Sequence, residues 1–354
     1  MTAITRQETA ALPVEFKLNG KAVVGRADET IIQTAKHYGI EIPHLCYKEG
    51  LRPDGNCRAC VVEIKGERTL APSCCRTPRD GMEVVTDSER ALASQKMVLE
   101  LLLSDMPEKS HTLDSELDRW ARKLEMGRPR FPQRRQPASD ISHPAIAVNL
   151  DGCIQCTRCL RACREEQVND VIGYAFRGEH AKIVFDFDDP MGASTCVACG
   201  ECVQACPTGA LMPARDAGQV EIDSEIDSVC PFCGVGCQLT YHVKDNRIVF
   251  VQGRDGPANA GRLCVKGRYG YDFIYSEERL KTPLIRENGS FREAGWDEAL
   301  DLVVARLAAI KNEHGPDAIA GVSCARSINE DSYQMQKLFR AVIGTNNIDH
   351  CART

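Results

Sequence analysis

The segments CIQCTRCLRAC, residues 153–163, and CVACGECVQACP, residues 196–207, repeat one spacing of cysteines. In both segments, three cysteines are separated by two residues each, and a fourth follows after three residues. Thiolates at this spacing hold [4Fe–4S] clusters, because three of them grip one cluster and the fourth reaches the cluster of the other segment. The repeat therefore predicts a small domain, residues 143–215, with two neighbouring clusters.

Crossed ligation divides these cysteines into two sets. Cluster A is predicted to bind Cys153, Cys156, Cys159 and Cys206. Cluster B is predicted to bind Cys196, Cys199, Cys202 and Cys163. A tetrahedral zinc site needs only four ligands and has no use for a duplicated, crossed arrangement. Iron–sulfur clusters are therefore the favoured interpretation.

The composition narrows the class of protein. The chain has 354 residues, 19 cysteines and a formal net charge of −6. Nucleic-acid binding requires an excess of lysine and arginine, so no nucleic-acid partner is expected. No apolar run has the length of a membrane span, and residues 1–20 lack the pattern of an export signal. A cytoplasmic location is expected, where clustered cysteines more often bind metal than form disulfides.

Residues 14–91 begin with the alternation of apolar and polar residues that is typical of strands. A helical stretch at 30–38 and a strand at 61–64 come next. Short strands around one helix predict a small β-grasp domain. A loop of this domain contains Gly55 and carries cysteines at the spacing C-x10-C-x2-C, namely Cys46, Cys57 and Cys60. A loop between a helix and a strand suits a [2Fe–2S] site, and a zinc site or unrelated thiols are the alternatives.

Residues 92–142 connect this domain to the repeated cysteine segments. The stretch from 88 to 126 favours helices, and its packing face is predicted at Leu99, Leu102 and Leu103. The segment RPRFPQRRQP, residues 128–137, is rich in proline and arginine and predicts a linker. We interpret it as a solvated connector, with a basic binding patch as the alternative.

A third group of cysteines lies in a segment predicted as a separate domain, residues 223–282. Its members are Cys230, Cys233, Cys237 and Cys264. On spacing alone, a zinc ribbon remains an alternative to a third [4Fe–4S] cluster, cluster C. Residues 283–354 change to an α/β pattern, with helices at 296–310 and 329–343 and a buried strand at 318–323. The chain as a whole is predicted to be an α+β multidomain protein.

The residues around the third group resemble a known family. CPFCGVGC at 230–237 and GRLCVKGR at 261–268 resemble the [4Fe–4S] domain of molybdenum or tungsten bis-pterin oxidoreductases, specifically formate dehydrogenases. WDEAL at 296–300 and GTNNIDHCAR at 344–353 resemble the first α/β segment of that family. The first cysteine group resembles a domain of complex I, iron-only hydrogenases and NAD-dependent formate dehydrogenases. From about residue 14 onward, the chain resembles the α subunit of cytoplasmic NAD-dependent formate dehydrogenases.

The resemblance implies roles for individual residues. The fourth [2Fe–2S] ligand of these relatives lies seven residues before the glycine of a turn that resembles Asp80-Gly81-Met82, which selects Cys74 and leaves Cys75 as its rival. Lys266 corresponds to the family lysine between cluster and pterin, where its charge favours electron passage; a solvated surface lysine is the alternative.

Two expected features of the family have no counterpart in this sequence. The relatives hold a further [4Fe–4S] cluster with one histidine and three cysteines, but Ser115 follows His111 where the first cysteine is expected. We therefore interpret His111 as an ordinary polar residue. On the register of the family, the catalytic cysteine or selenocysteine is expected immediately after Thr354. The sequence is expected to stop there either because a UGA codon that encodes selenocysteine follows or because the sequence is partial. On that register, Cys324 and Cys351 are predicted to be core thiols.

The resemblance also implies a function for the full-length enzyme, which is the oxidation of formate with NAD⁺ to CO₂ and NADH. Its cofactors are one [2Fe–2S] cluster, three [4Fe–4S] clusters and molybdenum or tungsten bis-MGD. Its partners are a β subunit that binds FMN and NAD and a small [2Fe–2S] γ subunit. This chain alone is expected to be inactive towards formate. The alternatives are an iron–sulfur subunit of an NAD-reducing hydrogenase or complex I-like NADH dehydrogenase, a stand-alone electron carrier, and a structural zinc protein.

Overall fold

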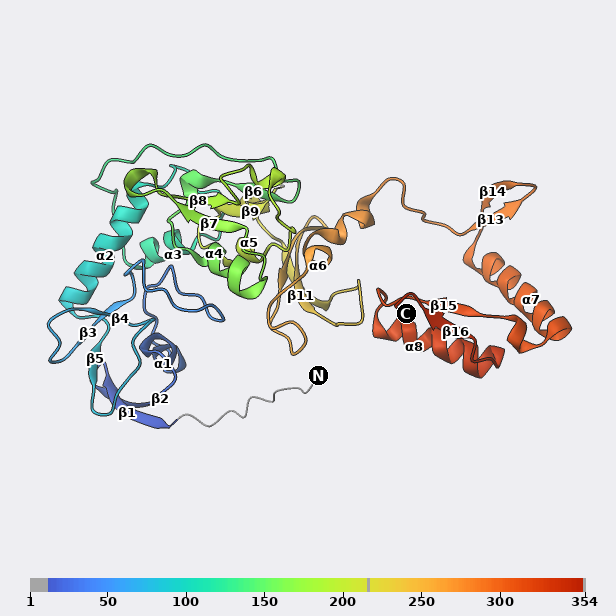
Figure 1. Ribbon diagram of the computed structural model, residues 1–354, viewed down its shortest axis with the longest axis horizontal. Helices are drawn as coiled ribbons and strands as arrows, with labels where there is room; N and C mark the ends of the chain where they lie inside the picture. Colours follow the sequence, from blue (N-terminus) through green and yellow to red (C-terminus); the bar gives the residue numbers. More distant parts are fainter. Residues whose placement is uncertain (1–11, 215–216, 353–354) are drawn as a thin grey trace. The chain divides into compact units, whose positions relative to one another are not determined.

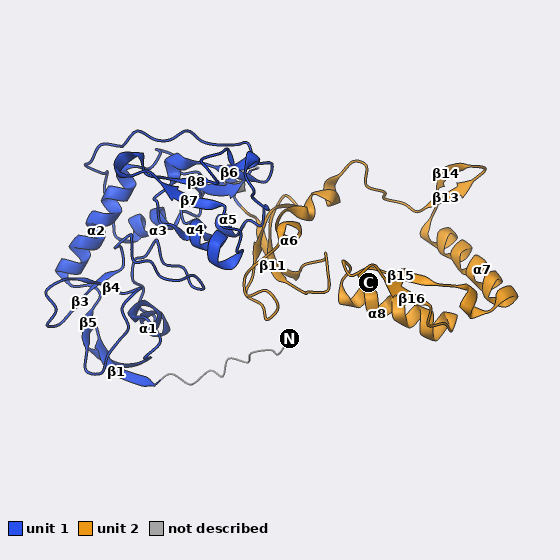
Figure 2. Cartoon of the chain, in the orientation of Figure 1, with its two compact units in different colours: residues 1–221 blue, residues 222–354 orange. Residues whose placement is uncertain are grey.

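The computed structural model describes residues 12–214 and 217–352 (Figure 1). The chain forms two compact units, residues 1–221 and 222–354, which are described separately (Figure 2). The catalytic ligand predicted after Thr354 lies outside the described residues. So do residues 1–11 of the N-terminal segment, in which no export signal is expected. Within the described ranges, no helix combines the length and the apolar composition that crossing a membrane requires.

The first unit begins with a five-stranded sheet in the order β2-β1-β5-β3-β4. Its strands are β1 (Pro13–Leu18), β2 (Lys21–Arg26), β3 (Val61–Ile64), β4 (Ala71–Pro72) and β5 (Glu83–Val85). β1 pairs in parallel with β5 and antiparallel with β2. Helix α1 (Ile31–His37) buries Ile31 and Ile32 in a core that includes the thiols of Cys60 and Cys74. The predicted strands and helix are confirmed, and they place two candidate ligands in the apolar core.

Helices α2 (Glu89–Ser104) and α3 (Glu116–Lys123) follow, and a serine caps each of them. The hydroxyls of Ser88 and Ser115 accept hydrogen bonds from backbone N–H groups three residues later, both at 3.2 Å. Such caps satisfy N–H groups that the helix itself leaves unpaired. The predicted packing face is confirmed in an apolar cluster that contains Leu99, Leu102, Leu103, Leu45, Leu117 and Trp120.

The segment 128–137 has no helix or strand, as a linker should, but it is more than a solvated connector. Arg130 forms two side-chain hydrogen bonds with Glu100 of α2, at 2.6 and 2.7 Å. Arg134 lies 3.3 Å from Asp105, with only 12% of its side chain exposed. The arginines therefore bind the segment to the end of α2. The interpretation as a solvated connector did not predict these contacts.

The repeated cysteine segments lie between two pairs of antiparallel strands. The pairs are β6 (Ile146–Val148) with β9 (Leu211–Pro213), and β7 (Ile172–Ala175) with β8 (Lys182–Phe185). A short helix carries the third cysteine of each segment, α4 (Arg158–Arg161) and α5 (Glu201–Ala205). Gln155 and Ala198 occupy equivalent positions and have φ values of 56° and 54°. Thr157 and Gly200 are also equivalent, with φ values of 62° and 74°. The two cysteine loops therefore share one backbone conformation.

The second unit starts with an antiparallel sheet in the order β10-β11-β12. Its elements are β10 (Ser224–Val229), β11 (Gln238–Lys244), β12 (Arg247–Gly253) and helix α6 (Val265–Tyr269). Leu239, Val251 and Leu263 form a small core with the buried Cys230. The third cysteine group thus lies at one end of this sheet and at the start of α6.

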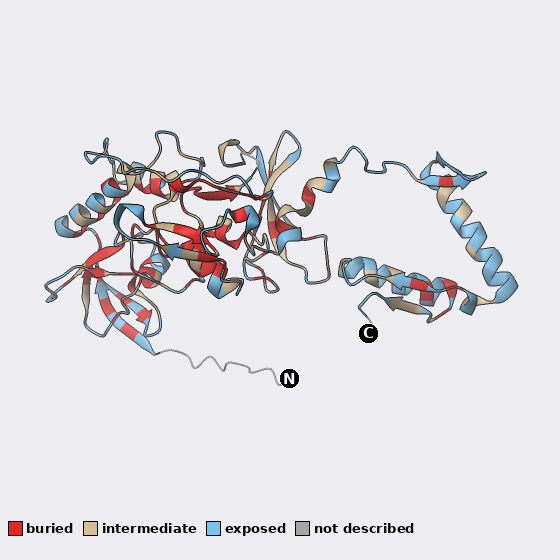
Figure 3. Cartoon of the chain, turned by 45° about the horizontal axis from the view of Figure 1, so that its top comes forward, coloured by how far each residue is buried: buried red, intermediate tan, exposed pale blue. Residues whose placement is uncertain are grey.

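The remaining elements follow an α/β pattern. They are β13 (Leu284–Glu287), β14 (Ser290–Glu293), α7 (Trp296–His314), β15 (Gly321–Ser323), α8 (Asn329–Lys337) and β16 (Ile348–His350). The predicted amphipathic helix is confirmed as α7, but its apolar side chains are exposed, with 69% for Trp296 and 64% for Val304 (Figure 3). Cys324 and Cys351 lie just beyond the paired strands β15 and β16, and both are exposed. The prediction of core thiols is therefore wrong.

Candidate iron–sulfur centres

The first cysteine group converges beneath the five-stranded sheet. The backbone N–H of Cys46 donates to Cys57 Sγ at 3.4 Å. The thiol of Cys74 contacts those of Cys46 and Cys60. Cys75 Sγ lies 3.6 Å from Cys74 Sγ, but the Cys75 side chain is exposed whereas Cys74 is buried. The structure thus brings Cys46, Cys57, Cys60 and Cys74 together, with Cys75 on the solvent side.

Hydrogen bonds among these thiols shift their pKa values in opposite directions. The thiol of Cys57, followed by that of Cys74, lowers the pKa of Cys46 to about 2. A hydrogen bond from Cys74 lowers the pKa of Cys60 to about 7. The donors themselves, Cys57 and Cys74, have raised pKa values because ionising them would break these hydrogen bonds. The thiols thus lie close enough to share hydrogen bonds, and a bound cation would offset the repulsion between four thiolates at this spacing.

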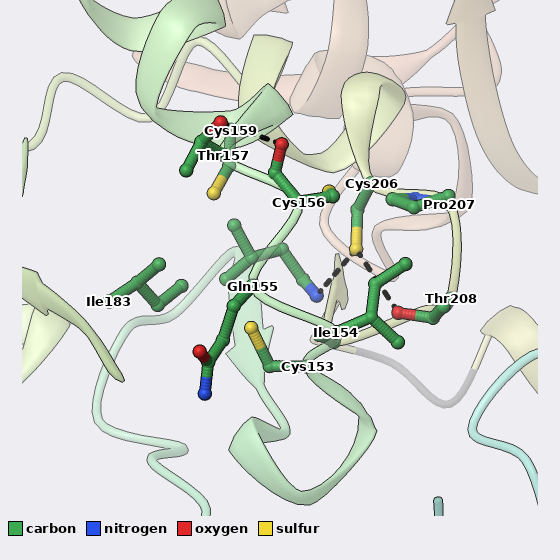
Figure 4. Close-up of a pocket in the computed structure, with 12 residues that line it drawn as sticks. Cys153, Ile154, Gln155, Cys156, Thr157, Cys159, Ile183, Cys206, Pro207 and Thr208 are labelled. Carbon is green, nitrogen blue, oxygen red and sulfur yellow. Dashed lines mark hydrogen bonds between the residues drawn. The ribbon is translucent and has the colours of Figure 1, made fainter. Parts of the chain in front are cut away.

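The set predicted for cluster A lines one cavity. This cavity holds about 310 Å³ of empty space, part of it open to solvent, and its lining includes Cys153, Cys156, Cys159 and Cys206. Figure 4 shows the four side chains around the gap, although Cys206 comes from the second segment. Cys206 Sγ accepts a hydrogen bond from the Leu211 N–H at 3.4 Å. Burial raises the pKa of Cys153 to about 11 and that of Cys156 to about 12.

The set predicted for cluster B lines a second cavity of about 310 Å³. Its cysteines are Cys163, Cys196, Cys199 and Cys202. Cys196 Sγ accepts a hydrogen bond from the Ala198 N–H at 3.4 Å, which the left-handed loop conformation directs towards the sulfur. Amide groups that donate to ligand sulfur are a regular feature of iron–sulfur sites.

The third group also comes together, at the end of the β10-β11-β12 sheet. The Cys230 N–H donates to the Cys237 carbonyl at 2.8 Å and closes the loop between them. Burial raises the pKa of Cys230, and the neighbouring thiols of Cys237, Cys264 and Cys233 add to this effect. Lys266 lies on α6, two residues after Cys264, and is exposed.

The loop of the third cysteine group contains Gly234 and Gly236. Gly236 has a positive φ of 72°. A Cβ atom on Gly234, however, would lie 2.6 Å from Asn329 Oδ1, so the side chain that needs this space is Asn329.

The donor sets fit iron–sulfur clusters in chemistry and in placement. Each set consists of four cysteines, two of the sets surround cavities, and backbone N–H groups donate to several of the sulfur atoms. Within residues 12–214 and 217–352, no group of three or more histidine, cysteine, aspartate and glutamate side chains has the arrangement that would hold a single metal ion. Binding of clusters by these cysteines stays a prediction.

Four family models match consecutive parts of the chain. They are the 2Fe-2S iron-sulfur cluster binding domain at residues 11–89, the ferredoxin-like domain of NADH-quinone oxidoreductase subunit 3 at 143–212, the molybdopterin oxidoreductase Fe4S4 domain at 223–276 and the molybdopterin oxidoreductase domain at 279–354. The chain therefore carries iron–sulfur domains and part of a molybdopterin oxidoreductase domain. The expected combination of [2Fe–2S], [4Fe–4S] and molybdopterin oxidoreductase domains is confirmed.

Relatives of the chain include proteins of Bacillus subtilis and Staphylococcus aureus. It is 32% identical to the "Probable oxidoreductase YjgC" of Bacillus subtilis over 95% of its own length. It is also 32% identical to a "Putative formate dehydrogenase" of Staphylococcus aureus strain USA300, again over 95% of its length. It spans 39% of the length of both relatives.

A solved structure resembles part of the chain. It is a crystal structure of NAD⁺-reducing [NiFe]-hydrogenase in the H₂-reduced state, and the match has a TM-score of 0.55 at 26% identity. The match covers 59% of this chain and 90% of the hydrogenase chain. An NAD⁺-reducing hydrogenase is one of the alternatives that the sequence left open, and this neighbour fits that alternative.

Several polar residues of the chain have structural roles that its sequence did not predict. His111 Nε2 lies 2.9 Å from Asp151 Oδ1, beside a cavity that Ser115 and Asp118 also line. Arg158 and Arg161, on either side of Cys159, are among the largest fully buried side chains. The segment RCLR, residues 158–161, contained a signal for these roles. Arginine is rarely buried without a partner, so two arginines beside a predicted cluster ligand indicate that each has a partner elsewhere in the chain.

Proposed function

We propose that the chain is the iron–sulfur relay part of the α subunit of an NAD-dependent formate dehydrogenase. The observation that carries the proposal is the succession, in one chain, of the [2Fe–2S], ferredoxin-like, Fe4S4 and molybdopterin oxidoreductase domains. The name of the Staphylococcus relative supports formate as the substrate. The reaction of the whole enzyme would be formate and NAD⁺ to CO₂ and NADH, with FMN and NAD on a partner β subunit and a small [2Fe–2S] γ subunit beside it.

The proposed ligands are the four sets of cysteines described above. The [2Fe–2S] cluster takes Cys46, Cys57, Cys60 and Cys74, in a domain of β-grasp type at residues 14–91. Clusters A and B take the crossed sets of the 143–215 domain, and cluster C takes Cys230, Cys233, Cys237 and Cys264. The large number of free cysteines supports a cytoplasmic location for the enzyme.

When bound, such clusters accept and release single electrons. The residues of the chain contribute burial, hydrogen bonds and charge. Burial of Cys156, Cys159, Cys163 and Cys202 limits the contact of clusters A and B with water. The N–H groups of Ala198 and Leu211 stabilise the negative charge on sulfur. Asn56 of the first loop donates to Thr157 of the cluster A loop at 3.0 Å, so the [2Fe–2S] loop packs on the loop of cluster A. We propose Lys266 as the charged group on the pterin side of cluster C.

Anaerobic reconstitution of the chain with iron and sulfide tests the proposal. We expect about 14 iron atoms per chain and four distinct reduced centres by EPR. Cys74→Ser should remove the [2Fe–2S] signal, whereas Cys75→Ser should leave it, because only Cys74 is buried among the other thiols. A colourless protein that binds zinc and no sulfide would reject the proposal.

A second candidate is the corresponding subunit of an NAD-reducing hydrogenase, supported by the structural match that covers 90% of the hydrogenase chain. The two candidates differ in electron donor. Reduction of the clusters by formate but not by H₂, in the complex purified from its source, supports the first. Reduction by H₂ alone supports the second.

A further inference from the structure

Arg161 occupies an unusual position between two candidate centres. It lies on α4, between Cys159 and Cys163, and only 1% of the residue is exposed. Arginine is almost never fully buried without partners, because removing its charge from water is costly. Its surroundings should therefore explain why the protein retains it.

The guanidinium group joins two cysteine loops through their backbones. One of its terminal nitrogens donates to the Cys46 carbonyl at 2.6 Å and to the Cys156 carbonyl at 3.3 Å. The other terminal nitrogen donates to the Arg52 carbonyl. Cys46 belongs to the first cysteine group and Cys156 to the set of cluster A. A single buried side chain thus holds the backbone of both candidate centres.

The charge of Arg161 is only partly balanced. Its Nε lies 3.1 Å from Asp54 Oδ2, an ion pair without hydrogen-bond geometry. Asp54 also lies near Arg52, at 3.3 Å, and accepts a hydrogen bond from Thr157 at 2.8 Å. Glu165 lies on the outer side of Arg52, at 3.3 Å. The other buried arginine of α4 is paired separately with a carboxylate of α3.

We propose that Arg161 is a positioning residue that fixes the [2Fe–2S] loop against cluster A and raises the reduction potentials of both centres. A buried positive charge stabilises the reduced state, which is the more negative one, and solvent screens it weakly. The hydrogen bonds place that charge at the junction of the two loops, where it acts on both. This inference rests on the ligand sets of the proposed function.

Redox titrations of the full chain with its clusters, followed by EPR, test the assignment. Arg161→Met should lower the midpoint potentials of the [2Fe–2S] centre and cluster A and leave cluster C unchanged. Asp54→Asn should raise the same two potentials, because it removes the balancing negative charge. Arg161→Lys should restore most of the potential lost in the Met variant. Opposite shifts of the midpoint potentials in Arg161→Met and Asp54→Asn identify a charge effect. Loosening of the loop contact would instead shift the potentials of both variants in the same direction.

The matched control is Arg164→Met, which removes an exposed arginine from the next turn and should shift neither potential. Unchanged potentials in Arg161→Met and Asp54→Asn would overturn the inference while leaving the proposed function intact. If Arg161→Met fails to assemble its clusters, the sign of the shift in Asp54→Asn decides. Absence of both centres from the unsubstituted chain would instead overturn the ligand sets, and the inference with them.

Discussion

The two cysteine segments have the same loop but different surroundings. Both loops place residues in the left-handed region at the same two positions after the first cysteine. The residues that flank the third cysteine differ in charge, since the first segment has Arg158 and Arg161 where the second has Glu201 and Gln204. The spacing of cysteines therefore sets the loop, and the residues between them adapt each copy to its own neighbours.

The neighbours explain this difference. Arg158 forms two hydrogen bonds with Glu116 of α3, at 2.7 and 2.9 Å, and Arg161 reaches the [2Fe–2S] loop. The first segment thus packs against two other parts of the first unit through buried cations. Glu201 stands at the position of Arg158 in the second segment, so Cys202 has a negative neighbour where Cys159 has a positive one. Three substitutions break or sharpen this comparison.

The largest expected effect is the loss of a whole cluster, which tests the crossing between the segments. Cys206→Ser should remove cluster A and about four iron atoms, because Cys206 lines the cavity with Cys153, Cys156 and Cys159. Iron analysis and EPR of the reconstituted chain measure this. Cluster B should remain in the variant.

Loss of cluster B instead of cluster A would show that each segment binds its own cluster without crossing. The control is Cys324→Ser, which removes an exposed thiol from the second unit and should leave the iron content unchanged.

Much of this site could be predicted from cysteine spacing, and the limits have physical causes. Spacing constrains a loop because four thiolates must converge on one compact core, so the eight cysteines of the repeat could be divided into sets before their cavities were known. The roles of Arg161 and Arg158 could not, because their partners, Cys46 and Glu116, lie more than 40 residues away in sequence.

The same limit explains the predictions that failed. Cys324 follows a short apolar strand, which suggested burial, but β15 ends at Ser323 and Cys324 is exposed. The segment 128–137 has the composition of a linker, but composition does not reveal that Glu100 of α2 and Asp105, just after α2, bind its arginines. Local pattern predicts conformation, whereas burial and ion pairs depend on residues distant in sequence.

The next effect concerns stability and compares a buried ion pair with an exposed one. Glu116→Gln leaves the charge of Arg158, which is 2% exposed, without its carboxylate. Breaking a buried pair in this way should lower the free energy of unfolding by about 3 kcal/mol, measured by denaturant unfolding of the chain with its clusters. Asp170→Asn breaks the exposed pair with Arg164 and should have no measurable effect. Equal losses in the two variants would contradict the special role of the buried pair.

The smallest effect concerns the loop conformation that both segments share. Gly200, with φ at 74°, adopts the left-handed conformation without a Cβ atom, whereas Thr157 adopts it at 62° with one. The Thr157 hydroxyl lies within hydrogen-bonding distance of Asp54, at 2.8 Å, and Asn56, at 3.0 Å, and these contacts offset the backbone cost in the first segment. Gly200→Ala adds that cost without such contacts and should lower the free energy of unfolding by about 1 kcal/mol.

The control for Gly200→Ala is Gly127→Ala, at a position with open space around the Cβ and no positive φ, which should not be destabilised. Thr157→Ala should cost at least as much as Gly200→Ala, because it keeps the backbone strain and removes the hydroxyl contacts. Full stability of Thr157→Ala would mean that the cysteine spacing alone holds this loop, and that the neighbouring domain does not contribute to the conformation of the first segment.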